Sequence, residues 1–449
     1  MAAAPRPGGV GGPVTTTTTT LRSTSRLLAV ADNGGGPDLD THVQVHGDPP
    51  RLTGAAARDG VLGALSRSGV TGRGGAGFPT TRKVDLLARQ RRRPVLLVNA
   101  MEGEPASAKD RVLLERAPHL VLDGAQVTGA LIRADHIVLC IPAEHGGAAH
   151  AVQVALAERA RRRIDALHVE LAAPPARYAA GEESALADWA AGGSGLPMFR
   201  PDKGVPMAVR RSPVLVQNAE TLAHVALVAR HGDAWYRSVG APDAPGTTLV
   251  TVTGAVQRPG VMEVELGTPV GHILAWAEVR RQPGGVLLGG YGGAWIEGSD
   301  LDVPFSPAAL RERGAAVGAG VIGVLPAGAC GLAETARLVA YLADESAGQC
   351  GPCTFGLPAV AEDLDRLAMG AADPALLERL RRRLEVIPGR GACGLPDGAV
   401  RLAHSALRVF AFDVANHARR RPCPGWAHRP TFPTPGVRRM SLWTTGTRR

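Results

Sequence analysis

Three cysteines in the C-terminal third have the spacing of a metal or iron–sulfur site. Cys350 and Cys353 form a Cys-x-x-Cys pair beside Gly and Pro, and Cys393 follows later in the chain. Thiolates in this layout ligate iron, and backbone N–H groups of such loops can donate to the sulfur atoms. Three thiolates do not complete a four-thiolate site, and three unrelated thiols are the alternative interpretation.

The other three cysteines do not extend this pattern. Cys140 falls in an apolar strand and is expected in the core. Cys330 is too far upstream to be assumed a ligand, and Cys423 lies on a basic tail. Six unevenly spaced cysteines in 449 residues do not indicate a disulfide framework.

A glycine-rich loop at 72–78 is the next candidate. It contains four glycines, which let a backbone approach a phosphate closely and present its N–H groups. The loop is neither a dinucleotide-binding fingerprint nor a P-loop, so an ordinary turn is the alternative. Lys83 follows on a predicted helix, and only Lys109 and Lys203 accompany it in a chain that otherwise uses Arg, which favours a phosphate or flavin site.

Three polar segments stand where an α/β sheet would present them to a ligand. Asn99, Glu102 and Glu104 follow a predicted buried strand, and ligands bind at the carboxyl ends of such strands. Residues 178–183 and 217–221 each open a predicted helix. Solvated acids and partners of the helix dipole are the alternative for the carboxylates.

The elements that must position these residues alternate along the first half of the chain. Apolar runs predict strands at 94–99, 136–141 and 166–171, and helical periodicity predicts helices at 80–90, 147–163, 180–191 and 219–231. This alternation is typical of an α/β fold with a mainly parallel sheet. A local ion pair is expected between Lys109 and Asp110.

The second half predicts two further units. Strands at 249–253 and 261–266, with a helix at 269–278 capped by Thr268, indicate a compact β-rich unit. Helices near 333–345, 357–370, 374–386 and 397–416 indicate an antiparallel bundle whose loops carry the cysteines. Residues 1–54 are of low complexity and are predicted to be disordered.

Charge and hydropathy exclude several classes of protein. Most of the net charge of +9 comes from the arginines of the tail at 418–449, which is predicted to be disordered, so the body gives no indication of nucleic-acid binding. A solvated tail is the default, and docking to an acidic partner or anionic lipid is the alternative. No apolar run approaches the roughly 18 residues of a membrane helix, and no secretory signal is evident. A cytoplasmic protein is expected, with association at the inner face of a membrane left open.

Taken together, these segments resemble the NADH- and FMN-binding flavoprotein subunit of respiratory complex I, a family that includes the diaphorase subunits of NAD-linked hydrogenases. The resemblance spans about 55–415 and is most specific at 72–79 and at 345–353. It implies a Rossmann-like FMN- and NADH-binding domain at 55–240, a β-grasp (SLBB) domain at 245–325 and a helical iron–sulfur domain at 330–417.

The resemblance also implies a role for each matching residue. The FMN contacts would be Gly72, Arg73, Gly74, Gly75, Lys83, Asn99, Glu102, Tyr178, Gly181, Glu182, Asn218 and Thr221. Glu104 and Glu183 would face the nicotinamide nucleotide, and Phe78 would stack on its adenine. Cys350, Cys353 and Cys393 would hold a 4Fe–4S cluster.

The chain departs from the family pattern at five positions. Met101 replaces an Asp, Gln217 replaces an Asn, and Leu86 and Lys203 replace aromatic residues of the nucleotide site. Ala347 replaces the first cysteine of the cluster motif. Three thiolates can hold a 3Fe–4S cluster or a 4Fe–4S cluster with a non-cysteine ligand, or the site can stay without a cluster.

The expected function is therefore that of a divergent NAD(P)H oxidoreductase subunit. Electrons would pass from NADH or NADPH through FMN to an iron–sulfur centre, and then to a ferredoxin-like or other iron–sulfur partner subunit or a quinone-reductase partner. Two alternatives remain open: an FMN-only electron-transfer module without a nucleotide site, and a non-catalytic assembly subunit.

Overall fold

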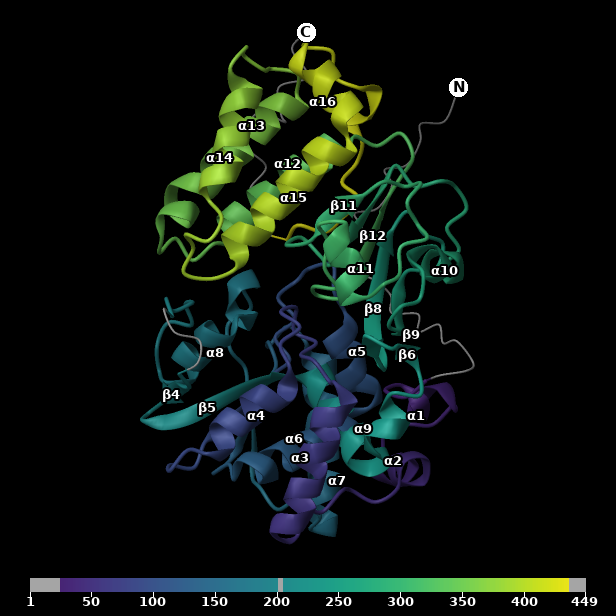
Figure 1. Cartoon of the computed structure of the whole chain (residues 1–449), viewed down its shortest axis with the longest axis vertical. Coiled ribbons are helices and arrows are strands. Elements are labelled where there is room, and N and C mark those ends of the chain that lie inside the picture. The colour runs from purple at the N-terminus through teal and green to yellow at the C-terminus, as the bar shows by residue number, and fades with distance from the viewer. Residues whose placement is uncertain (1–24, 201–204, 436–449) are drawn as a thin grey trace, which may run out of the picture.

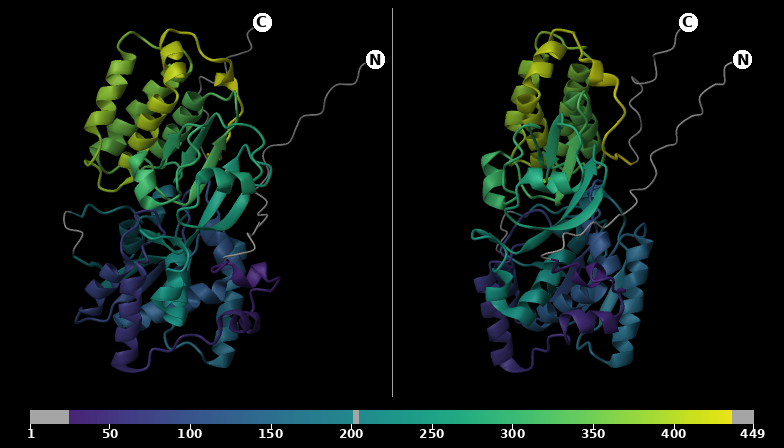
Figure 2. Two further views of the ribbon diagram at one scale, coloured as in Figure 1. Left: turned by 45° about the vertical axis from the view of Figure 1, so that its right-hand side comes forward. Right: turned by 90° about the vertical axis from the view of Figure 1, so that its right-hand side faces the viewer.

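The computed structural model describes residues 25–200 and 205–435. Three units are stacked along the long axis: an α/β unit, a second sheet with its own helices, and a C-terminal group of helices (Figures 1 and 2). Lys203 lies outside the described residues, as do the outer parts of the two segments predicted to be disordered. Among the residues described, no helix is both long and apolar enough to cross a membrane.

The first sheet has five strands in the order β3–β2–β1–β5–β4. They are β1 (Val95–Asn99), β2 (Ile137–Cys140), β3 (Val169–Ala172), β4 (Met207–Val209) and β5 (Ser212–Asn218). All neighbours pair in parallel except β4 and β5, so the predicted parallel sheet is confirmed. Strands β2 and β3 follow β1 on one side of the sheet, whereas β5 lies on the other side of β1. The strand order therefore reverses between β1 and β5.

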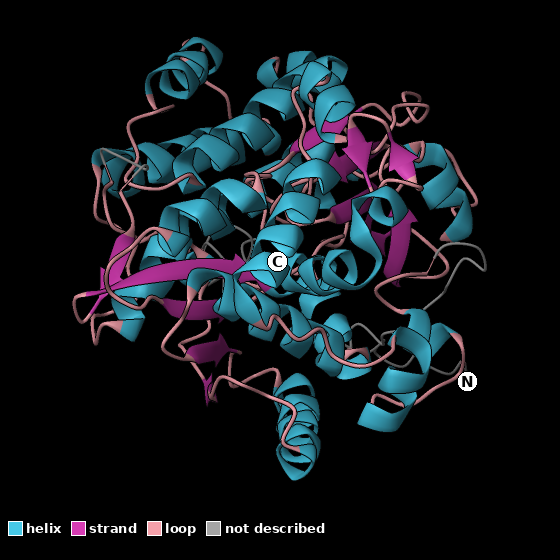
Figure 3. Ribbon diagram, turned by 60° about the horizontal axis from the view of Figure 1, so that its bottom comes forward, coloured by secondary structure: helices cyan, strands magenta, loops and turns pink. Residues whose placement is uncertain are grey.

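Helices cover both faces of this sheet (Figure 3). One face shares a core with α3 (Gly54–Ser68), α4 (Thr80–Ala88), α5 (Lys109–Arg116), α6 (Pro118–Ile132), α7 (Gly146–Arg162) and α9 (Ala219–Tyr236). The other face packs against α8 (Glu183–Ala190), which follows the 3-10 turn η1 (Tyr178–Gly181). Helices α6 and α9 cross so closely that a Cβ atom on Gly124 would lie 1.8 Å from the carbonyl oxygen of Leu222.

The prediction of disorder through residue 54 was wrong for its described part. Helices α1 (Ala29–Asp32) and α2 (Leu39–His46) form there, and Leu27 and Leu28 are fully buried. The backbone N–H groups of Arg26, Leu27 and Leu28 donate to one carboxylate oxygen of Glu263, at 2.9–3.1 Å. Composition carried no sign of this because the anchor is a distant buried carboxylate.

The second sheet has the order β11–β10–β12–β8–β9. Its strands are β8 (Thr247–Gly254), β9 (Gly260–Glu265), β10 (Gly285–Leu288), β11 (Ala294–Ile296) and β12 (Val321–Leu325). A short hairpin of β6 (Gly240–Ala241) and β7 (Ala244–Pro245) precedes it. Only β12 and β8 are parallel among its pairs, and helices α10 (Val270–Trp276) and α11 (Pro307–Glu312) flank the sheet. The predicted cap of α10 was wrong, since Pro269 is its N-cap and no side chain caps it.

The helical unit consists of α12 (Gly331–Asp344), α13 (Leu357–Ala368), α14 (Leu376–Val386), α15 (Leu395–Val409) and α16 (Ala411–Ala418). The helix predicted at 397–416 is broken at Phe410, whose ring packs edge-on against Trp295 with centroids 5.3 Å apart. Cys353 lies in a π-helical turn, η2 (Pro352–Gly356), rather than in an irregular loop.

The start of the predicted disordered tail is also ordered, which corrects that prediction for residues 418–435. After the 3-10 turn η3 (Pro424–Ala427) the chain folds back onto α12. Glu334 accepts the backbone N–H groups of Thr431 and Phe432, and the Phe432 ring is buried. The backbone contacts with Glu334 and the buried Phe432 ring hold this arginine-rich segment, and the composition of the segment does not predict them.

Candidate functional site

The predicted ligand residues meet where the strand order reverses. Asn99 ends β1 and Asn218 ends β5, and the two are paired in register. In open α/β sheets the crevice beyond such a reversal is where ligands bind. The Asn99 amide donates to the carbonyl of Gly181 at 2.8 Å, which adds the third polar segment to the same place.

The glycine-rich loop closes over this point. The N–H group of Gly72 donates to the carbonyl of Phe78, and the N–H group of Arg73 donates to Oγ1 of Thr221, both at 2.8 Å. A Cβ atom on Gly74 would sit 3.4 Å from the Cβ atom of Asn218. Gly75 has φ of +108°, a conformation that favours glycine. The loop therefore presents backbone, not side chains, at the ends of β1 and β5.

The Arg73 side chain turns away from the loop. Its guanidinium is buried and donates to the hydroxyl of Tyr236 and the carbonyl of Thr247, and its Nε atom lies 3.9 Å from Glu220. Arg73 thus fixes the loop against α9 and β8. Its predicted contact with FMN could come only from its backbone in this arrangement.

Lys83 supplies the positive charge expected beside the loop. Its ammonium pairs with the Glu183 carboxylate and lies 5.9 Å from the centre of the Phe78 ring. Burial, together with the nearby Arg200, lowers the pKa of Lys83 to about 8. The pairing brings three predicted residues together, and the Phe78 ring remains 44% exposed, as a stacking surface would require.

Two predicted FMN residues act as helix caps. Glu102, with φ of +43°, accepts the backbone N–H groups of Asp110 and Arg111 at the start of α5. Glu182 accepts the N–H groups of Ser184 and Ala185 at the start of α8. Carboxylates at helix N-termini are favourable without any ligand, so these residues position the site whatever else they contact.

Glu104 is a buried acid of the site with a raised pKa. It is 8% exposed, and one oxygen accepts from the Tyr178 hydroxyl at 3.2 Å and from the Tyr291 backbone N–H at 2.8 Å. Its other oxygen is buried without a partner among the described residues. Burial raises the pKa of Glu104 to about 7. Groups with such shifts cluster at functional sites.

A buried charge network underneath the site exceeds what the sequence predicted. The expected pair of Lys109 and Asp110 is present at 2.8 Å, and the same ammonium lies 2.8 Å from Glu220 of α9. Burial lowers the pKa of Lys109, but the two carboxylates more than offset this and hold it above its ordinary value. Asp110 also accepts from the amide of Asn218 at 2.7 Å. The network links α5 to Glu220 of α9 and to Asn218 at the end of β5. Of these contacts, the sequence indicated only the pair of Lys109 and Asp110.

The three predicted cluster cysteines converge at one end of the helical unit. Burial raises the pKa of the Cys353 thiol to about 12, with further contributions from its contacts with Cys350 and Cys393. Burial also acts on Cys350, but hydrogen bonds from the backbone of Ala392 and of Cys353 outweigh it and lower that pKa. The hydroxyl of Ser346 also reaches Cys353.

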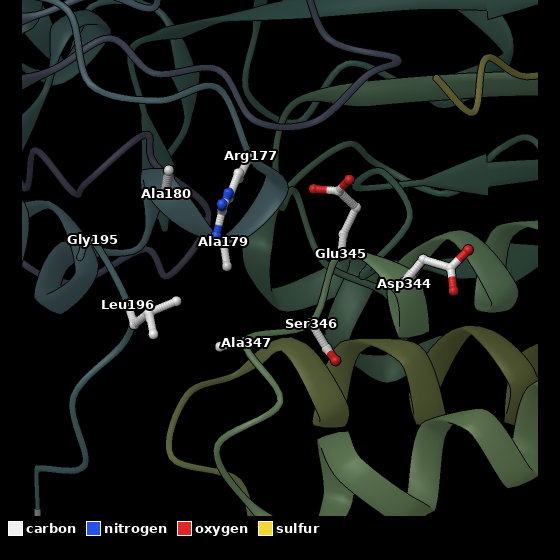
Figure 4. A pocket seen from close by; sticks show the side chains of 9 residues that line it. All are labelled: Arg177, Ala179, Ala180, Gly195, Leu196, Asp344, Glu345, Ser346 and Ala347. Atoms are coloured by element: carbon white, nitrogen blue, oxygen red, sulfur yellow. The ribbon is translucent and has the colours of Figure 1, made fainter. Parts of the chain in front are cut away.

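A cavity of about 140 Å³ lies between this end of the helical unit and the segment at 177–196, which contains η1 and α8. It is lined by Arg177, Ala179, Ala180, Gly195, Leu196, Asp344, Glu345, Ser346 and Ala347. Figure 4 shows these residues coming from two segments, with Ala180, Gly195 and Leu196 on the left and Asp344, Glu345 and Ser346 on the right. Glu345 bridges the two units by accepting the Tyr178 backbone N–H at 2.9 Å. The position that lacks a cysteine therefore faces the segment that carries Tyr178 and Gly181.

The other described positions that differ from the family pattern lie in different environments. Met101 is 2% exposed in the core that packs on α8, so an apolar side chain fits there. Gln217 is buried, and its Nε2 atom has no partner among the described residues. Leu86 is partly buried against the main core.

Outside these positions, Cys140 is fully buried in β2, as predicted.

Two protein families match separate parts of the chain. Residues 65–227 match the Nuo51 FMN-binding domain, and residues 333–417 match the NADH-ubiquinone oxidoreductase-F iron–sulfur binding region. The first span contains the carboxyl ends of β1 and β5 and the glycine-rich loop beside them. The second contains the three converging thiols.

Similar proteins and structures agree with these matches. The NADH-quinone oxidoreductase F subunit of Streptomyces coelicolor is 30% identical over 396 residues, which cover 84% of this chain and 88% of that protein. The NADH-quinone oxidoreductase F 2 subunit of Rhizobium meliloti is 29% identical over 390 residues, covering 83% and 92%.

Among solved structures, the NAD⁺-reducing [NiFe]-hydrogenase matches in two states. In the air-oxidised state the TM-score is 0.73 at 30% identity, covering 80% of this chain but only 63% of the hydrogenase chain. In the H2-reduced state the TM-score is 0.78 at 28% identity, covering 91% and 68%. With a 30% identical relative matched over most of its length, the chain belongs to the family of the NADH-quinone oxidoreductase F subunits.

Proposed function

We propose that this chain is the NADH-oxidising flavoprotein subunit of an electron-transfer complex. It would bind FMN in the crevice at β1 and β5 and pass electrons to an iron–sulfur centre at Cys350, Cys353 and Cys393. The observation that carries the proposal is the bridge from Tyr178 to Glu345, because it joins the predicted FMN segment to the cluster segment.

The described residues fit an FMN in the crevice. Gly74 and Gly75 leave the backbone open for a phosphate, and Lys83 supplies a cation at the rim of the same loop. The buried Gln217 amide lacks an acceptor among the described residues, which a bound polar ring could provide. The residues therefore support FMN as the ligand, with the contacts that the resemblance assigns to Asn99, Asn218 and Gly181.

The thiols fit an iron–sulfur centre with one protein ligand fewer than the family pattern. Cys350, Cys353 and Cys393 interact with one another, and Ala347 stands beside the cavity where the fourth ligand would lie. Each iron of a 4Fe–4S cluster carries an outer ligand, so one iron here would bind solvent or a non-cysteine group. A labile 4Fe–4S cluster or a 3Fe–4S cluster follows from this ligand set.

The protein's own side chains would position the nicotinamide nucleotide. Bound FMN supplies hydride acceptance and the release of single electrons. Glu104 would hold a proton near neutral pH beside Tyr178. Glu183 and Lys83 would line the path of the nucleotide near the Phe78 ring. The contacts of Tyr291 and Gly290 with Glu104 mean that the second sheet helps to form this site.

The second sheet and the helical unit would form the contact with partners. The second sheet has five strands with parallel and antiparallel pairs, and with α10 and α11 it is compatible with a β-grasp (SLBB) domain at 245–325. The relatives are subunits of larger complexes, so an iron–sulfur partner subunit is expected to receive the electrons. A ferredoxin-like partner, at the periphery of a membrane complex, is the specific form that we propose.

An absorbance spectrum of the full chain, purified without oxygen, tests the proposal before and after addition of NADH. Flavin bands that bleach with NADH, together with about one FMN per chain, are expected. Flavin that millimolar NADH or NADPH leaves oxidised would instead support the FMN-only module. A folded, colourless protein that takes up no added FMN would contradict the proposal altogether.

A further inference from the structure

A second group of metal-ligating side chains lies outside the predicted cluster. The Sγ atoms of Cys330 and Cys423 and a ring nitrogen of His417 lie within 4.8 Å of one another. Cys330 is 2% exposed and His417 is fully buried, whereas Cys423 is half-buried. Cys330 is the N-cap of α12, so it is separated from the Cys350 segment by the whole helix, roughly 21 Å at 1.5 Å per residue.

We propose that Cys330, His417 and Cys423 bind Zn²⁺ or a divalent cation of similar preference, such as Co²⁺. The three would ligate it through two thiolates and Nε2 of the imidazole, with a solvent ligand on the half-exposed Cys423 side. A tetrahedral zinc site has Zn–S and Zn–N bonds near 2.3 and 2.0 Å, which place S and N ligand atoms about 3.5 Å apart. In the structure, Sγ of Cys330 lies 3.8 Å from Nε2 of His417.

The surroundings of His417 and Cys330 are those of metal ligands. Nδ1 of His417 lies 2.8 Å from the carbonyl of Ala368 and 3.2 Å from that of Leu367. Donation from Nδ1 fixes the tautomer that leaves the Nε2 lone pair facing the thiols, as second-shell carbonyls do for ligating histidines. The Cys330 sulfur accepts the backbone N–H of Ala333 at 3.4 Å, which orients it at the start of α12. Burial raises the pKa of this thiol, so a metal ion would have to displace its proton.

Binding of the cation would replace one hydrogen bond to His417. The backbone N–H of Cys423 donates to Nε2 of His417 at 2.9 Å, and the cation would take over that lone pair. The two thiols would release their protons to solvent as the metal binds. No electron transfer is involved, so the site is independent of the flavin and of the iron–sulfur centre.

The site would fasten the C-terminal segment to the start of α12. Cys423 begins the turn η3, and Gly425 packs so tightly that a Cβ atom there would lie 2.0 Å from the carbonyl of Gly328. The N–H of Cys330 donates to the carbonyl of Gly425 at 3.2 Å. One cation would therefore join the N-terminus of α12, the end of α16 and the segment that covers Glu334.

Metal analysis of the full chain tests the proposal, using the variant Cys350→Ser/Cys353→Ser/Cys393→Ser so that cluster iron does not interfere. After growth with zinc and desalting under reducing conditions, about one zinc per chain is expected. Adding Cys423→Ser should lower this at least tenfold, while adding Cys140→Ala, a small apolar replacement in the core, should not. Cobalt loading should give the thiolate charge-transfer and ligand-field bands of a tetrahedral thiolate site.

Two results would overturn the proposal. One is zinc below a tenth of an equivalent with no cobalt bands in a folded chain, which would leave only the hydrogen bonds described above. The other is a Cys330–Cys423 disulfide found by mass spectrometry after alkylation of the chain purified under reducing conditions. Cys423 is half-buried near the surface, so its change to Ser should leave the fold intact.

Discussion

At the scale of single residues, Glu104 makes a pH-dependent contribution to stability. Its folded pKa of about 7 lies above the ordinary value of 4.5, so the folded chain binds more protons between these values. The free energy of unfolding should therefore fall as pH rises from about 4.5 to about 7, by roughly 2–3 kcal/mol. Glu104→Gln should lack this fall, and urea denaturation of both proteins across that range measures the difference. Parallel curves would contradict the assignment.

The Lys109 network is a second prediction about single residues. Lys109→Met should leave Asp110 and Glu220 buried without their cation, and the expected loss of unfolding free energy is about 3–5 kcal/mol. The exposed pair of Arg313 and Asp300 gives the control, because Arg313→Met should have little effect. Chemical denaturation compares the two. Equal effects would mean that the buried charges are relieved by solvent.

At the scale of elements, the glycine-rich loop gives a direct test of FMN binding. Gly74 has an ordinary backbone, and a Cβ atom would meet Asn218 only at contact distance, so the fold should accept a side chain. Gly74→Asp should fill the space of the phosphate and add a like charge, which should lower FMN affinity by at least a hundredfold. Gly74→Ala is the matched control, and titration of apoprotein with FMN measures both. Unchanged affinity in Gly74→Asp would exclude the loop as the phosphate site.

The segment between α12 and η2 carries the corresponding test of the cluster. The three thiols already converge, and Ala347 borders a cavity of about 140 Å³, so a thiol there has room. Ala347→Cys should convert an oxygen-sensitive cluster into a stable 4Fe–4S centre. Iron analysis and EPR before and after exposure to air compare it with the original chain and with Ala347→Ser. An equally stable four-iron cluster in the original chain would show that another residue supplies the fourth ligand.

Prediction from sequence succeeded where apolar runs and helical periodicity carry the signal. The parallel strands β1 and β2 follow from continuous apolar runs, and the bundle helices follow from an apolar period of about 3.6 residues. Strand β5 was missed, because Pro213 interrupts a short apolar run whose pairing with β1 is visible only in three dimensions. The capping by Glu102 and Glu182 was likewise hidden, since a capping carboxylate and a ligand-binding one look alike in sequence.

At the scale of the whole molecule, contacts between distant segments decide how the units are joined. Periodicity predicts the separate units but not their contacts, because these depend on single side chains far apart in the chain. Tyr291, in the connection between β10 and β11, completes the surroundings of Glu104, and Glu345 of the helical unit holds Tyr178. The site is therefore shared by all three units, although the predicted ligand residues come mostly from the first.

Glu263 provides the test of how the N-terminal segment is held. One oxygen of this buried carboxylate accepts three backbone N–H groups, from Arg26 to Leu28, and the other accepts the hydroxyl of Thr247. Glu263→Ala should leave these donors buried without an acceptor, at a cost of about 3 kcal/mol or more, since each unsatisfied group costs about 1–3 kcal/mol. Hydrogen exchange should accelerate at 26–28 while the amides of β1 keep their protection. The exposed Glu297→Ala is the control, and slow exchange at 26–28 in Glu263→Ala would mean that burial of Leu27 and Leu28 alone holds the segment in place.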